Sequence, residues 1–266
     1  MKLAACIPWT SPFLWTGCVD SLLNLERPAE VRNILGRVEP LEVRFFRGPG
    51  WCPAKRHASA CEQALAWGAD LILILGADQV YQPDLLRRLV ARFEQGCEVV
   101  AALVPARAFI GWQDMQPFQR MAWRLKRSGS ISVGQLNDLA SLKNEVEVID
   151  PAAGELQEVD FIGSGVLMFQ ADHLRAMAQP WFSESYDPIT MERTASMDTR
   201  FVWRLRNEAG ARVWVDTTIR VGHLHAFTID ETFSGRFADW TQPGVGDPQL
   251  CRFPEAKTEI PQTAVS

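Results

Sequence analysis

A single acid, Asp78, stands directly behind a short and continuous apolar run. Leu71 to Leu75 are five consecutive aliphatic residues, and only Gly76 and Ala77 separate them from the acid. An apolar run of this length that stops at small residues predicts a buried central strand. Ligands of open α/β sheets bind outside the carboxyl ends of the strands, so Asp78 is a candidate ligand-binding acid.

Two cations, Lys55 and Arg56, fall in the first turn of a helix predicted over residues 54–67. The helix dipole disfavours cations at that end by a few tenths to ~1 kcal/mol. Two interpretations follow. Either the side chains are solvated or paired with Glu62 or Asp70, or they and the free backbone N–H groups bind an anion such as a phosphate or pyrophosphate.

Three further candidates lie late in the chain, and each has a structural alternative. Gly163, Ser164 and Gly165 precede a predicted strand, where either the backbone approaches a ligand closely or the chain makes a bulge or tight turn. Asp198 opens a predicted helix and is either a catalytic base or an N-cap.

His223 forms an H-x-H pattern with His225 beyond a predicted strand. On a strand this spacing puts both rings on one face, where they can share a metal ion. The commoner role of such a histidine is that of a packed or surface residue.

The elements that must position these residues alternate between strand and helix. This alternation predicts an α/β fold with a mostly parallel, Rossmann-like sheet and helices on both faces. Residues 20–25 with 31–35 predict one helix or two short ones. Strands over 146–149 and 156–159 flank a turn and predict a small β-hairpin insertion.

We expect one domain over residues 1–225 and a proline-rich C-terminal tail or lid over 226–266.

Composition excludes several classes of protein. With 27 basic and 32 acidic residues the formal net charge is −5, which is unsuited to wholesale binding of nucleic-acid phosphates. No apolar run approaches the roughly 18 residues of a transmembrane segment, and the first residues are too short an apolar stretch for a signal peptide. The six cysteines form no C-x-x-C pair. A reducing cytoplasmic location is therefore expected.

Three blocks, residues 54–90, 159–169 and 197–224, resemble in order and spacing the nucleotide-sugar-dependent glycosyltransferases of the GT-A fold. The resemblance is strongest to glycosyltransferase family 2. It implies a metal-dependent hexosyltransferase that moves a sugar from a UDP- or GDP-sugar to an acceptor hydroxyl, with inversion. The acceptor is an unidentified saccharide, protein or small molecule, and the cofactor is Mn²⁺ or Mg²⁺.

The same resemblance implies roles for individual residues. Asp78 and His223 would be the metal ligands, Asp198 the catalytic acid near the acceptor, and Arg56 would lie along the pyrophosphate. The full set of donor-binding residues implied is Pro8, Lys55, Arg56, Gly76, Ala77, Asp78, Gly163, Ser164 and Gly165.

Two positions depart from the family pattern. Gly76 stands where the first acid of the D-x-D motif is expected, and Met197 stands where an acid often precedes Asp198. A nucleotide-sugar-binding relative without turnover is therefore an alternative. A nucleotidyltransferase is a further one, although the loop after the first predicted strand, PWTSPFLWTG, lacks the glycine-rich basic character of such enzymes.

Overall fold

The structure, a computed structural model, describes residues 1–9, 14–33, 35–105, 122–126, 131–132, 145–150, 153–186, 189, 191 and 193–224. The predicted C-terminal tail, His225 and all of residues 106–121 lie outside this part of the chain. No helix in the described ranges is both long enough and apolar enough to span a membrane.

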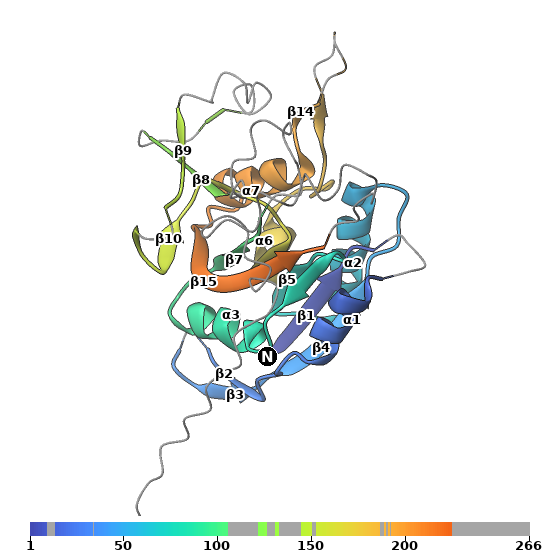
Figure 1. The fold of residues 1–266 in the computed structure, drawn as a ribbon, viewed down its shortest axis with the longest axis vertical. Helices are drawn as coiled ribbons and strands as arrows, with labels where there is room; N and C mark the ends of the chain where they lie inside the picture. The colour runs from blue at the N-terminus through green and yellow to red at the C-terminus, as the bar shows by residue number, and fades with distance from the viewer. Residues whose placement is uncertain are drawn as a thin grey trace, which may run out of the picture.

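Within the described residues a central sheet of eight strands organises the fold, in the order β10-β15-β7-β12-β5-β1-β4, with β6 paired to β15 (Figure 1). The strands are β1 (Lys2–Ile7), β4 (Glu42–Arg47), β5 (Leu71–Leu75), β6 (Gln79–Tyr81), β7 (Val99–Leu103), β10 (Leu156–Glu158), β12 (Val166–Gln170) and β15 (Val213–His223).

Most of the sheet runs in one direction. β1 is parallel to both β4 and β5, and β7 is parallel to β15. β12 is antiparallel to both of its neighbours, β5 and β7, so β7 points the same way as β5. The carboxyl ends of β1, β4, β5, β7 and β15 therefore meet at one edge, and the amino end of β12 joins them there. The predicted mostly parallel α/β sheet is confirmed.

Helices cover both faces of the sheet, as β5 shows most directly. All five of its residues are buried, and alternate side chains enter two separate cores. Ile72 and Ile74 pack with residues of α2 (Pro53–Trp67), α6 (Ala171–Ala176) and α7 (Met197–Asn207). Leu71, Leu73 and Leu75 pack with residues of α1 (Thr16–Leu23) and α3 (Leu85–Glu94). Burial on both faces explains why this strand is continuously apolar rather than alternating.

The predicted small antiparallel insertion is present, but its strands pair differently from the expected hairpin. β9 (Val146–Val148) pairs with β8 (Ala122–Leu125), which also pairs with β11 (Phe161–Ile162). β10, the second strand of the expected hairpin, instead pairs with β15 and extends the central sheet. Alternating apolar residues predict a strand but carry no information on its partner.

One expected helix is wrong. Val31 lies in β2 (Glu30–Arg32), which pairs antiparallel with β3 (Val38–Pro40). The Asn33 side chain accepts hydrogen bonds from the backbone N–H groups of Leu35 and Arg37, which closes a turn at this point. A side-chain bond of this kind competes with helical hydrogen bonding. Two short strands, β13 (Ser185–Tyr186) and β14 (Arg193–Ala195), also pair with each other.

Candidate functional site

The candidate residues from the sequence converge on one edge of the central sheet. Pro8 follows β1, the start of α2 follows β4, and residues 76–78 follow β5. Residues 163–165 precede β12, whose amino end lies at the same edge because that strand is reversed. The backbone N–H of Gly76 donates to the carbonyl of Gly165 at 2.8 Å, which joins two of these segments directly.

A bend in β15 brings His223 to this edge. Val213 to Asp216 pair with β7, the register then shifts before Arg220, and Val221 to His223 pair with β6. β6 begins immediately after Asp78, and the backbone N–H of Leu224 donates to the carbonyl of Asp78 at 2.8 Å. The end of β15 is therefore fixed against the turn that carries the acid.

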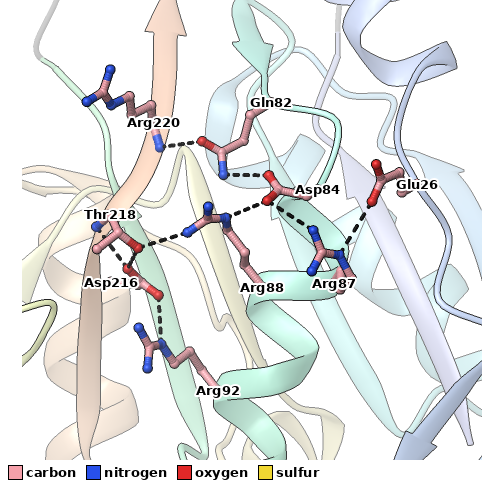
Figure 2. A network of polar contacts seen from close by, with 9 residues as sticks. All are labelled: Glu26, Gln82, Asp84, Arg87, Arg88, Arg92, Asp216, Thr218 and Arg220. Carbon is pink, nitrogen blue, oxygen red and sulfur yellow. Dashed lines mark hydrogen bonds and ion pairs between the residues drawn. The ribbon is translucent and has the colours of Figure 1, made fainter. Parts of the chain in front are cut away.

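A polar network holds the bend against α3 and the end of β6. Figure 2 shows its members, which are Glu26, Gln82, Asp84, Arg87, Arg88, Arg92, Asp216, Thr218 and Arg220. Asp216 is buried, accepts from Arg92 Nε at 2.7 Å, and also accepts from the backbone N–H and the hydroxyl of Thr218. These bonds close the chain into a tight turn where the register of β15 against β7 shifts.

The same network continues to the far side of the bend. Arg88 donates to the hydroxyl of Thr218 at 3.1 Å and to Asp84 at 2.7 Å. Gln82 donates to Asp84 and accepts from the backbone N–H of Arg220 at 3.0 Å (Figure 2). The two segments of β15 that flank the register shift are therefore both bonded to side chains from α3 and the loop before it.

Asp78 and His223 face each other across this arrangement. The distance from His223 Nε2 to Asp78 Oδ1 is 3.6 Å, and both side chains are partly exposed. His223 Nδ1 lies 2.7 Å from the carbonyl oxygen of Pro105. A carbonyl only accepts, so Nδ1 carries a proton, and Nε2 is the ring nitrogen that faces the carboxylate.

This geometry fits a shared divalent cation. Two ligands about 2.1 Å from one ion and at right angles lie about 3 Å apart, so the 3.6 Å between these two atoms would shorten by about 0.6 Å on binding an ion. A metal-binding histidine usually donates its other ring N–H to a carbonyl or carboxylate, as His223 does. The described residues contain no cluster of three or more His, Cys, Asp or Glu side chains suited to a metal. Two protein ligands would thus leave the other coordination positions to ligand oxygens and water.

Asp198 does not cap α7. The N-cap is Ser196, whose hydroxyl accepts from the backbone N–H of Thr199, and Asp198 lies in the first turn. The Asp198 carboxylate instead accepts a hydrogen bond from the hydroxyl of buried Ser164, at 2.5 Å. The alternative that Asp198 is merely a helix cap is wrong, and its role as a catalytic base stays a prediction.

Of the two interpretations of Lys55 and Arg56, pairing with Glu62 or Asp70 is not found among the described residues, whereas solvation of Lys55 is consistent with its exposure. Arg56 Nε donates to the carbonyl of Gly50 at 3.1 Å, while Lys55 is exposed. Cys52 is the N-cap of α2 and makes no side-chain capping bond. The loop packs tightly here, because a Cβ on Gly48 would lie 1.9 Å from the carbonyl oxygen of Arg56.

His57, one turn into α2, interacts electrostatically with Asp198 but is not singled out by any sequence pattern. Its Nδ1 lies 2.8 Å from the carbonyl oxygen of Pro53, and its ring lies 5.2 Å from that of Phe182. Burial lowers the pKa of His57, while the bond to Pro53 and the charge of Asp198 act in the opposite direction. The ring is therefore neutral at pH 7. The available signal was its position directly after Arg56, at the start of the helix whose first turn was already a candidate anion-binding site.

Comparisons with known proteins give fold-level likenesses only. No protein-family model matches the chain, and no curated protein matches it. Similar solved structures include A197 from STIV, with a TM-score of 0.49 and 13% identity over 85% of this chain and 87% of that one. They also include S. aureus TarS 1-349 in complex with UDP-GlcNAc, with a TM-score of 0.39 and 13% identity over 88% and 61%. A third is UDP-glucose pyrophosphorylase complexed with UDP-glucose, with a TM-score of 0.36 and 7% identity over 68% and 60%. Likenesses of this strength leave function to be argued from the site itself.

The bend in β15 yields a stability prediction. Arg92→Met should lower the free energy of unfolding by about 3–5 kcal/mol, because it leaves the buried Asp216 carboxylate without its partner. Arg87→Met is the matched control. The Arg87 side chain is 64% exposed, so the loss of its ion pairs should lower the free energy of unfolding by only about 0–1 kcal/mol. Urea denaturation of both variants measures the difference, and equal losses would contradict this account of the bend.

His57 yields a pH prediction. A histidine whose pKa is lowered on folding contributes stability above its unfolded pKa of about 6.5, and that contribution is lost as pH falls through the lower folded pKa. Stability of the wild type should therefore fall between pH 7.5 and about pH 5. In His57→Gln the fall should be smaller, because one of the groups that protonate on unfolding is gone. The measurement is the free energy of unfolding in urea at several pH values, and parallel pH profiles for both proteins would refute it.

Proposed function

We propose that this protein is a metal-dependent, inverting glycosyltransferase of the hexosyltransferase type. It transfers a sugar from a UDP- or GDP-sugar to an acceptor hydroxyl. The observation that carries the proposal is the arrangement of Asp78 and His223, in which His223 Nδ1 donates to the Pro105 carbonyl and Nε2 faces the carboxylate. The blocks of sequence that resemble glycosyltransferase family 2 contain both residues.

Asp78 and His223 would hold Mn²⁺ or Mg²⁺, and the imidazole favours Mn²⁺ somewhat. When bound, the cation neutralises negative charge that develops on the departing diphosphate. An oxygen-rich diphosphate also supplies the coordination that two protein side chains leave open. Metal and nucleotide are therefore expected to bind together.

The start of α2 would bind the donor's diphosphate. Arg56 Nε donates to the Gly50 carbonyl, which fixes the guanidinium group, and Lys55 is exposed beside it. No side chain caps the first N–H groups of this helix, as is also true of α1, α3 and α6. Those N–H groups and two cations together suit a phosphate. Pro8, Gly76, Ala77 and the 163–165 loop, at the same edge, would line the rest of the donor.

Asp198 would accept the proton of the acceptor hydroxyl as that oxygen attacks the anomeric carbon from the face opposite the diphosphate. Ser164 holds Asp198 Oδ1 in place. No hydrogen bond to Oδ2 is found within the described residues, and that oxygen would take the proton. Neutral His57 adds no positive charge near the carboxylate that would weaken it as a base.

Metal and nucleotide binding test the proposal first. UDP or GDP should raise the melting temperature more with Mn²⁺ than without it, because binding to the folded state stabilises by mass action. Asp78→Ala should abolish the extra shift, and Asp172→Asn, an exposed acid on α6, is the control that should retain it. The panel includes UDP-GlcNAc and UDP-glucose, the ligands of two similar structures. No coupling in the wild type, or full coupling in Asp78→Ala, would rule the metal site out.

Turnover is tested separately through Asp198. Asp198→Asn should lower the rate of sugar transfer about 10²- to 10⁴-fold, because the amide cannot accept the acceptor's proton. Nucleotide affinity should stay near that of the wild type. The assay follows release of nucleoside diphosphate. If the wild type binds donor but releases neither free sugar nor nucleoside diphosphate under any condition, the protein is a nucleotide-sugar-binding relative without turnover.

A further inference from the structure

Gln79, the first residue of β6, is a buried polar side chain with an unsatisfied oxygen. The residue is 3% exposed, and among the described residues its Oε1 meets no hydrogen-bond donor. Leaving a buried acceptor unpaired costs about 1–3 kcal/mol, so buried amides are normally satisfied. A donor group is missing from its surroundings.

Two glycines make room for this amide. A Cβ on Gly76 would lie 2.7 Å from both Cδ and Nε2 of Gln79, and a Cβ on Gly165 would lie 2.1 Å from Nε2. Neither distance is compatible with the present position of the amide. The same glycines are bonded to each other through N–H and C=O at 2.8 Å. A side chain at position 76 and the Gln79 amide therefore exclude each other.

The amide also lies between the two pairs of candidate site residues. Gln79 follows Asp78 in sequence and is the register partner of His223 across the β6–β15 pairing. Directly opposed residues of antiparallel strands have Cβ atoms about 5 Å apart. On the other side, Gly165 adjoins Ser164, which bonds to Asp198. A ligand that spans from the Asp78–His223 pair to Asp198 would pass this amide.

We propose that Gln79 is a ligand-binding residue of this site, whose Oε1 accepts a hydrogen bond from an O–H group that arrives with the ligand. The inference rests on the proposed function and deepens it. The O–H group is either a hydroxyl of the nucleoside diphosphate or a water molecule carried by the divalent cation. Gln79 thus provides a neutral acceptor from β6, in the space where a side chain at position 76 would begin.

The test uses Gln79→Met, which keeps length and apolar volume but removes the acceptor. Titration calorimetry would compare it with the full-length wild type for Mn²⁺ alone, UDP alone and both together. Loss of one neutral hydrogen bond should weaken binding about three- to tenfold. Weakening with Mn²⁺ alone identifies a metal-bound water as the donor. Weakening confined to Mn²⁺ and UDP together points to the same water in the ternary complex, whereas weakening with UDP alone identifies a nucleotide hydroxyl.

Gln157→Met is the matched control. Gln157 is also a buried glutamine on a strand, but its Nε2 already donates to the carbonyls of Asp150 and Gly154. The Gln157→Met variant should be less stable than the wild type but should bind Mn²⁺ and UDP with wild-type affinity. Equal affinities of Gln79→Met and wild type for every probe would overturn the inference while leaving the proposed function intact. Wild-type protein that binds neither Mn²⁺ nor UDP or GDP would instead refute the proposed function.

A second measurement does not depend on the folding of any variant. In ¹⁵N-labelled wild-type protein the side-chain amide resonances of Gln79, assigned through its own Cγ, should shift on addition of UDP with Mg²⁺. The side-chain amide of Gln157 should not move. A Gln79 amide whose resonances stay unchanged at saturating ligand contradicts the proposal.

Discussion

The bend in β15 is the constraint on which the candidate site depends. The register of β15 against β7 shifts between Asp216 and Arg220, and only beyond this shift do Val221 to His223 pair with β6. Polar contacts at the bend offset the energetic cost of this register shift. Asp216 is buried where the register breaks, and its carboxylate accepts from Arg92 and from two donors of Thr218. A buried carboxylate is tolerated only when it is satisfied in this way.

That arrangement couples α3 to the site, although no residue of α3 belongs to it. Arg88 and Arg92 lie one turn apart on the helix, and each bonds to the turn at the bend. Beyond the bend, Gln82 accepts from the Arg220 backbone, and three residues later His223 lies beside Asp78. The position of the imidazole is thus set by backbone pairing on one side and by Pro105 on the other, rather than by side-chain packing alone. Residues held from both sides lose little entropy when a ligand binds.

The sequence predicts the scaffold well because the relevant signals are local. A doubly buried strand such as β5 is continuously apolar, and the end of α2 at Gly68 needs a positive φ that glycine adopts freely. Partner choice is not local, and there the predictions are weakest: β9 and β10 are both strands but do not pair with each other. The bend in β15 is hidden for the same reason, since it depends on the register against β7 and on the pairing with β6. Likewise Ser196 and Asp198 are equally good caps by type, and only the structure assigns the cap to Ser196.

The two departures from the family pattern have different physical explanations. Met197 is buried in the core beneath α7, so an acid at that position would require a charge to be buried among Phe201, Val202 and their neighbours. Gly76 is different, because the Gln79 amide occupies the space where a side chain at position 76 would begin. A carboxylate next to Asp78 would raise the negative charge of the site, whereas a neutral amide does not. Under the proposed function, Asp78 would be the one charged protein ligand to the cation, so the chain by itself would attract a divalent cation weakly. Tight binding would then depend on the negative charge of the diphosphate, and the cation would be retained and released together with the nucleotide.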